Sequence, residues 1–174
     1  NRALFGAGPY GGTPTAKSLT SLTQAELAAF HAASWRPDNA VLVIAGDVTP
    51  EVGFAMAEEA LGAWAKPTTP APTAPAAGAV GAPRAIALDM PQIGQAAVFL
   101  GRPGPSRLAD DYYATAVANN VLGGGYSARL NAEIRIKRGL SYGANSSLSA
   151  RKQPGPIIAA AQTRNDAVPD VVDL

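Results

Sequence analysis

The chain has 174 residues, of which 47% are hydrophobic and 16% are charged, and its formal net charge is +1. This near-neutral balance gives no electrostatic reason to expect nucleic acid or an anionic membrane as a partner, and no apolar run approaches the roughly 20 residues of a membrane span. The sequence contains no cysteine, which excludes disulfides and thiolate metal sites and leaves an oxidising and a reducing compartment equally open.

The N-terminal region is predicted to contain a loop and then a helix. Residues 1–22 are rich in glycine and proline, which is typical of a loop. Thr23 and Glu26 have the spacing of a capping box, so a helix is expected to begin there and to run to about Trp35 with one apolar stripe. We expect His31, the only histidine, to pack on the inner face of this helix.

A buried strand and a second helix are predicted next. Residues 40–45 form the continuous apolar run AVLVIA, which is short for a helix and rich in β-branched side chains. We therefore expect a central strand that is buried on both faces. Thr49 and Pro50 then supply an N-cap and a first-turn proline for a helix that runs to about Trp64.

Proline marks a boundary in the middle of the chain. Residues 67–83 contain five prolines, and the remaining positions are mostly Ala, Thr and Gly. This composition predicts an extended linker that has no means of packing a core. The linker separates residues 1–66 from residues 84–174.

The region after the linker is predicted to open with a pair of strands at 84–89 and 95–101. The second of these segments is rich in apolar side chains. A helix is expected to start at about Ala109 and to end at the glycines 123–125, which suit a left-handed C-cap.

A further helix is predicted at about 127–138, with Gly139 as its stop. Strands at 141–150 and 156–163 then flank a Lys-Gln-Pro-Gly turn and are expected to form a hairpin. Antiparallel hairpins that intermix with helices, without strict alternation, predict an α+β fold. In such a fold mixed, largely antiparallel sheets carry helices packed on one face.

Most autonomous catalytic sites cannot be assembled from these side chains. Zinc hydrolysis needs about three protein ligands, usually His and Glu, and the chain has one histidine and no cysteine. A serine nucleophile would need a base and a Gly-x-Ser-x-Gly elbow, and the elbow is absent. The triple glycine at 123–125 lacks the Gly-Lys-Ser/Thr ending of a phosphate loop and follows a helix, so a helix terminator is favoured.

Arg135 and Tyr142 are the remaining candidates for a chemical role. Gly139 separates them, so they are expected on consecutive elements from which they could converge on one point. A guanidinium and a phenol can both donate hydrogen bonds to one carbonyl oxygen, polarising a peptide bond and stabilising the oxyanion that forms on attack. The structural alternative makes Arg135 a solvated helix residue beside Lys137 and Arg138, and Tyr142 an ordinary strand aromatic.

Two segments of the sequence resemble a known family. SLTQAELAAFHAASWRPDNAVLVIAGDVTPE and LGGGYSARLNAEIRIKRGLSYGANSS are similar to two signatures of the pitrilysin/insulinase zinc peptidases, the inverted zincins that include mitochondrial processing peptidase. The resemblance covers most of the chain outside the linker. It implies paired homologous α+β domains, of which residues 1–66 would complete one and residues 84–174 would open the next. Both ends of the chain would then be cuts through a longer protein.

The resemblance also implies a division of the catalytic site. In the family, zinc is held by His-x-x-Glu-His and a later Glu on one domain, and the facing domain supplies an arginine and a tyrosine that bind the substrate carbonyl. The zinc motif is absent here, whereas Arg135 and Tyr142 match the arginine and the tyrosine. Gly124, Ser127 and Arg129 lie in the same signature and are expected to contribute to substrate binding.

The implied function is the substrate-binding part of a zinc metallopeptidase that processes or degrades peptides. No cofactor is expected in this chain, which should not be active alone. Zinc would lie on an upstream domain or on a partner subunit that carries His-x-x-Glu-His, in a hetero-oligomer or in a longer single-chain enzyme. The substrate would be an unfolded peptide that binds as an added strand, and a bacterial periplasm or cytoplasm would both be suitable compartments. The alternative is an inactive structural homologue, similar to the core subunits of the respiratory cytochrome reductase.

Overall fold

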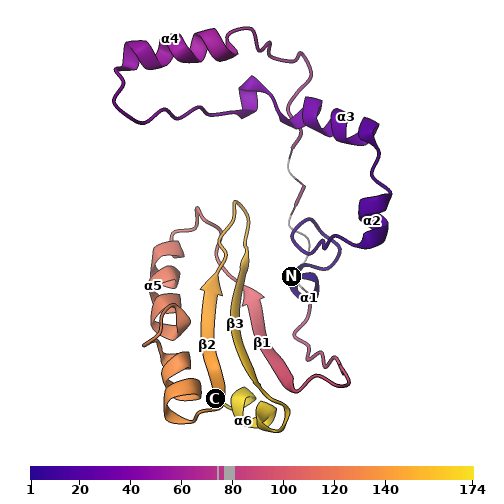
Figure 1. The fold of residues 1–174 in the computed structure, drawn as a ribbon, viewed down its shortest axis with the longest axis vertical. Helices are drawn as coiled ribbons and strands as arrows, with labels where there is room; N and C mark the ends of the chain where they lie inside the picture. The colour runs from indigo at the N-terminus through magenta and orange to yellow at the C-terminus, as the bar shows by residue number, and fades with distance from the viewer. Residues whose placement is uncertain (74, 77–80) are drawn as a thin grey trace. The chain divides into compact units, whose positions relative to one another are not determined.

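The computed structural model describes residues 1–73, 75–76 and 81–174, and the chain divides into two compact units (Figure 1). Asn1–Thr13 and Ala76–Leu174 form the first, which we call the sheet unit because it contains all the strands of the described chain. Pro14–Pro75 form the second, which we call the helical unit. The proline-rich segment 67–83 contains neither helix nor strand among its described residues.

The sheet unit is built on three antiparallel strands. They are β1 (Gln95–Pro103), β2 (Ser141–Leu148) and β3 (Pro156–Arg164), in the spatial order β1-β3-β2. β2 and β3 pair as an antiparallel hairpin, so the predicted hairpin is confirmed. Since β3 is central, β1 and β2 are both edge strands.

The strand predicted at 84–89 is absent. These residues lack regular secondary structure, and the side chains of Ile86 and Leu88 are exposed. β1 pairs instead with β3, from Gln95↔Arg164 to Pro103↔Pro156. The prediction of a local pair was wrong because β1 finds its partner some sixty residues later in the chain.

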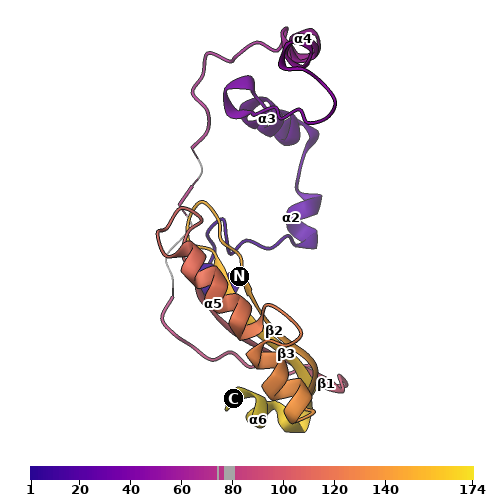
Figure 2. The same cartoon turned by 90° about the vertical axis from the view of Figure 1, so that its left-hand side faces the viewer.

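Helices cover one face of this sheet and close its core. α5 (Tyr112–Gly123) packs against β2, as Figure 2 shows, and a π-helix, η2 (Asn131–Lys137), follows it. The short α6 (Val168–Val172) contacts β1 and β3. The core consists of the buried side chains of Ile134, Ala144, Ala161 and Val171, with Val98, Leu130 and Leu140 packed against them. The predicted α+β class, with helices on one face of an antiparallel sheet, is confirmed.

The C-terminal end of α5 lies directly against the backbone of β2. A Cβ atom added to the buried Gly123 would lie 2.2 Å from the amide nitrogen of Ser146. The Asn119 side-chain amide donates to the carbonyl oxygen of Ser146 at 3.4 Å, and the Ser146 hydroxyl donates to the carbonyl oxygen of Asn119 at 3.2 Å. Gly123 is therefore required by close approach between a helix and a strand.

The left-handed C-cap predicted for residues 123–125 is not present. Gly124 caps α5 with φ −79°, an ordinary right-handed value. The left-handed glycine lies instead at Gly139, with φ +62°, where the amide of Gly139 donates to the carbonyl oxygen of Arg135 at 3.0 Å. The prediction that Gly139 stops a helix is confirmed. Its left-handed conformation ends the helix, and glycine adopts this conformation more readily than residues with a side chain.

The first residues of the chain belong to the sheet unit. α1 (Arg2–Phe5) buries Phe5, whose ring meets that of Tyr10 edge-on at 5.8 Å. The Tyr10 hydroxyl accepts a hydrogen bond from the amide of Gln153 at 3.4 Å. Residues 1–22 are therefore not simply a loop: they include α1 and, in the helical unit, α2 (Ala16–Thr20).

The helical unit contains the helices whose caps the sequence specifies. α3 (Gln24–Ser34) starts with the predicted capping box, in which Thr23 and Glu26 bond each other reciprocally and lower the pKa of the Glu26 carboxyl. α4 (Pro50–Leu61) starts with the predicted Thr49 cap and a proline in its first turn. Between them lies a single 3₁₀ turn, η1 (Pro37–Asn39). Both helix predictions are confirmed.

This unit has no apolar core of its own among its described residues. Only Arg36 and Gly53 are buried. Residues 40–45, predicted as a buried central strand, have no strand pairing, and the side chains of Val41 and Val43 are 90% and 80% exposed. The prediction was wrong for this chain because a strand needs neighbouring strands, and none in the described residues pairs with this segment. Exposed apolar side chains also line α3 and α4 and their ends: Leu27, Phe30, Trp35, Val52, Phe54 and Met56.

His31 also differs from its prediction. Its side chain is exposed, and the imidazole stacks on Trp35 with ring centroids 6.2 Å apart. Trp35 in turn stacks on Trp64 at 6.1 Å. His31 has no inner face to pack on, because no apolar layer formed by described residues covers α3.

A buried arginine holds the C-terminal segment of the helical unit in place. Arg36 is 2% exposed and donates to both carboxylate oxygens of Asp38, at 2.5 and 2.7 Å, and to the carbonyl oxygen of Thr69 at 2.7 Å. The hydrogen bonds from Arg36, together with the charge of its guanidinium, hold the pKa of the Asp38 carboxyl below its ordinary value. The start of the proline-rich segment is therefore tied to the turn that follows α3.

Candidate functional site

Arg135 lies in the π-helix, two residues before its end. η2 has the wide i→i+5 pattern over Asn131–Lys137, and left-handed Gly139 terminates it. π-Helical turns are rare and are often found at functional sites. The Arg135 side chain is half-buried, so it is neither beneath the core nor fully solvated.

The charges around Arg135 are distributed unevenly. Glu133 forms ion pairs with Lys137 and, at 2.6 Å, with Arg138. Hydrogen bonds from Lys137 and then from Arg138 are the main reasons that the pKa of the Glu133 carboxyl is lowered. Arg135 has no ion pair or side-chain hydrogen bond with any described residue. Of these three neighbouring cations, it alone keeps its N–H donors unused within the described chain.

One aromatic ring supports the Arg135 side chain. The guanidinium carbon lies 5.1 Å from the ring centroid of Tyr126, a cation–π distance. Tyr126 is in the turn between α5 and η2 and is 67% exposed. The sequence prediction did not include this residue.

Tyr142 lies on β2 at an irregularity of the ladder. Ser141 pairs with Thr163 and Ala144 with Ala161, so three steps along β2 oppose two along β3. This is a β-bulge over Tyr142 and Gly143, a feature that changes the direction of side chains. The Tyr142 side chain is 86% exposed.

Arg135 and Tyr142 are both accessible and lie on consecutive elements of one unit, η2 and β2. No hydrogen bond or ring contact between described residues joins the two side chains. The other three predicted residues, Gly124, Ser127 and Arg129, are exposed in the segment between α5 and η2. Gly124 also helps to line an open cavity of about 570 Å³ along α5, which reaches Ser146 of β2.

A buried asparagine, also missed by the sequence prediction, connects this segment to β2. Asn131 is 4% exposed, its amide group donates to the carbonyl oxygen of Tyr126 at 2.6 Å, and its side-chain oxygen accepts from the amide of Ala144 at 3.4 Å. The only sequence signal for it was an asparagine among the apolar positions of a helix, which does not distinguish a buried link from an exposed residue.

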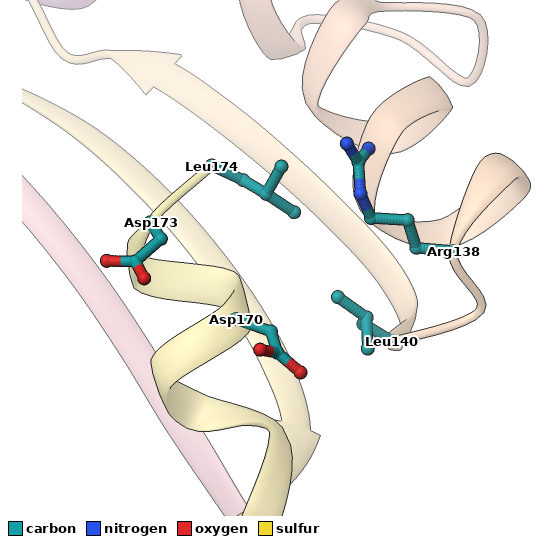
Figure 3. A pocket seen from close by; sticks show the side chains of 5 residues that line it. All are labelled: Arg138, Leu140, Asp170, Asp173 and Leu174. Atoms are coloured by element: carbon teal, nitrogen blue, oxygen red, sulfur yellow. The ribbon is translucent and has the colours of Figure 1, made fainter.

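A second cavity, of about 390 Å³, lies between the end of η2 and α6 (Figure 3). Its lining consists of Arg138, Leu140, Asp170, Asp173 and Leu174. Arg138 is already paired with Glu133. Neither Arg135 nor Tyr142 lines this cavity, so it is separate from the predicted pair.

The side chains that the structure describes do not fit a zinc site. The described residues contain no group of three or more His, Cys, Asp or Glu side chains that could hold a metal ion. The single histidine is exposed and stacked on an indole. In the described part of the chain, no helix has both the length and the apolarity that crossing a bilayer requires.

Comparison with known sequences gives relatives that are peptidases by name. The chain is 30% identical to an uncharacterised zinc protease of Mycobacterium leprae, over 99% of the chain and 39% of that protein. It is 33% identical to an uncharacterised zinc protease of Streptomyces coelicolor, over 92% of the chain and 36% of that protein. The chain thus spans about two fifths of the length of these relatives.

Comparison with solved structures shows the same fold. The peptidase M16 inactive domain from Pseudomonas fluorescens superposes with a TM-score of 0.83 at 30% identity, over 99% of this chain and 42% of that one. A protease from Helicobacter pylori superposes with a TM-score of 0.80 at 18% identity, over 91% of this chain and 40% of that one, which shows the fold alone.

A family model described as the peptidase M16 inactive domain matches residues 21–174. This match covers most of the chain, and it confirms the family resemblance predicted from the two sequence segments. The chain belongs to the M16, or pitrilysin-type, zinc peptidase family, within the group of its inactive domains.

Proposed function

We propose that this chain is the substrate-binding, non-metal-binding part of a zinc metallopeptidase, and that Arg135 and Tyr142 bind the carbonyl group of the peptide to be cleaved. A carbonyl oxygen has two lone pairs and can accept from a guanidinium and a phenol together. As charge develops on that oxygen, both hydrogen bonds strengthen, which lowers the barrier to attack on the carbonyl carbon.

The observation that carries this proposal is the selective pairing of charge in the π-helix. Glu133 binds Lys137 and Arg138 and leaves Arg135 without a carboxylate. A guanidinium that is held by an aromatic face keeps its edge donors available for a ligand. The exposed phenol of Tyr142, on a bulged edge strand, supports the second half of the proposal.

The remaining parts of the peptidase are proposed to come from outside this chain. Zinc would be held by His-x-x-Glu-His on an upstream domain or on a partner subunit, since no described residues here fit it. That domain would also complete the helical unit, whose apolar side chains have no core to enter among the described residues. The peptide substrate would bind as an extended strand at a sheet edge.

The proposal is tested by kinetics in the zinc-loaded peptidase that contains this chain. Arg135→Ala and Tyr142→Phe should each lower kcat/KM by about a hundredfold or more, since losing one oxyanion donor typically removes roughly 2.7–4 kcal/mol of transition-state stabilisation. Arg102→Ala and Tyr112→Phe are matched controls, because Arg102 is an exposed arginine of β1 and Tyr112→Phe keeps the ring that Arg107 contacts. Both controls should retain the parent rate.

If Arg135 and Tyr142 have only a structural role, the kinetic result will differ. If Arg135→Ala and Tyr142→Phe leave kcat/KM unchanged while zinc content and unfolding temperature also stay unchanged, the pair does not bind the reacting carbonyl. The chain would then be an assembly homologue of the same fold.

A further inference from the structure

We propose that Tyr126 and Asn131 are positioning residues that hold Arg135 in place relative to Tyr142. This inference rests on the proposed function, because it assigns these two side chains a role at the same site. Neither is expected to touch the substrate.

The first step is the contact between Tyr126 and Arg135. An arginine side chain has several rotatable bonds, and ordering it takes about 2 kcal/mol of rotamer entropy. The Tyr126 ring, whose centroid is 5.1 Å from the guanidinium carbon, supports that group from one side. A cation over a ring face uses the π-surface, so the N–H donors at the guanidinium edge stay free.

The second step is the attachment of Tyr126 itself. Its carbonyl oxygen accepts the 2.6 Å hydrogen bond from Asn131, so the exposed turn is anchored to a buried side chain. Asn131 starts the π-helix that carries Arg135. The backbone that carries the Tyr126 ring and the helix that bears Arg135 are therefore fixed to each other.

The third step connects the same asparagine to the strand of Tyr142. The Asn131 side-chain oxygen accepts from the amide of Ala144, the first residue after the bulge at 142–143. Each end of one buried amide group thus has a complementary partner, and exchanging its oxygen and nitrogen would place like groups together. Through Asn131, the turn that supports Arg135 and the strand that carries Tyr142 share a single link.

The test is a double-mutant cycle on kcat/KM in the zinc-loaded peptidase that contains this chain. Tyr126→Leu should lower kcat/KM by about two- to fivefold, the value of an exposed to partly buried cation–π contact, and Tyr126→Phe should recover most of that loss because it keeps the ring. In the Arg135→Ala background, Tyr126→Leu should have no further effect. Tyr126 is largely exposed, so its variants are expected to fold.

Asn131→Ala supplies a second measurement. It should lower kcat/KM, and the loss should shrink when Arg135 is already alanine, whereas any fall in unfolding temperature should be the same in both backgrounds. The two proposals fail differently. If Arg135→Ala alone has no effect, both are overturned. If Arg135→Ala lowers the rate but Tyr126→Leu is silent, or acts equally in both backgrounds, only the positioning inference is overturned.

Discussion

At the scale of single residues, the most restrictive position is a glycine that the sequence analysis interpreted differently. Gly123 was expected to cap a helix through a left-handed conformation. Its importance comes instead from the short distance between its Cα and the backbone of Ser146. There is no room for a Cβ atom between α5 and the backbone of β2. Gly125, two residues later, has open space around its Cα.

Gly123→Ala should therefore destabilise the sheet unit, while Gly125→Ala should not. Overpacking against a backbone that cannot move away typically costs about 1–3 kcal/mol, and a substitution in open space stays within about 0.5 kcal/mol. Urea unfolding of the two variants and the parent chain measures the difference. Equal stability of the two variants would show that α5 can move off β2 without loss.

At the scale of elements, one carboxylate joins two cations at the end of the π-helix. Glu133 binds two cations near the C-terminal end of η2, and both contacts lower its pKa in the folded chain below the ordinary 4.5. A depressed carboxyl pKa adds stability that is present above pH 4.5 and is lost as the pH falls through the folded value.

Glu133→Gln should lower the unfolding temperature above pH 4.5, and the gap to the parent chain should close on acidification below that pH. Thermal unfolding recorded from pH 7 to pH 3 provides the measurement. Asp89→Asn, at an exposed carboxylate that forms no ion pair with a described residue, is the control and should leave the unfolding temperature at pH 7 unchanged. A gap that persists at pH 3 would mean that the glutamate acts through packing, with its charge playing no part.

The elements also show what could be predicted from the sequence. Helix starts at Thr23 and Thr49 were predicted correctly because a cap is a contact between residues three apart. The β2–β3 hairpin was correct for the same local reason. The pairing of β1 with β3 was not predicted, because it depends on residues distant in the sequence. The π-helical form of η2 was not predicted either.

The candidate site divides in the same way. Arg135 and Tyr142 were selected from their types, their interval and a family resemblance, and the roles assigned to them remain predictions. Tyr126 and Asn131 were not predicted as site residues, because the role proposed for them depends on three contacts that only the folded backbone creates. No periodicity or composition identifies a residue whose partners are a turn carbonyl and a strand amide.

At the scale of the whole molecule, the helical unit lacks the core that its apolar side chains require. The segment AVLVIA at 40–45 has no regular secondary structure, is exposed and forms no backbone hydrogen bonds to described residues. Apolar strands of this kind pair readily with an open sheet edge. The proposed upstream or partner domain would supply that edge and would cover α3 and α4.

Hydrogen exchange tests directly whether another domain pairs with residues 40–45. In the isolated chain, the amides of Val41–Ile44 should exchange freely, whereas in the peptidase that contains this chain they should exchange at least about tenfold more slowly, because paired strands protect their amides. The amides of Ala159–Ala161 on central β3 serve as the internal control and should be protected in both samples. Identical exchange of residues 41–44 in the two samples would contradict the proposed completion, whatever the fate of Arg135 and Tyr142.

The way the chain passes between the two units determines what happens when a protease cleaves the proline-rich segment. Because Asn1–Thr13 packs with the residues that follow the proline-rich segment, the helical unit is an insertion within the sheet unit. A single cleavage in that segment would leave the N-terminal fragment attached only by non-covalent docking. The contacts of α1 with β1, and the hydrogen bond from the Gln153 amide to the Tyr10 hydroxyl, would then decide whether the two fragments separate or remain together.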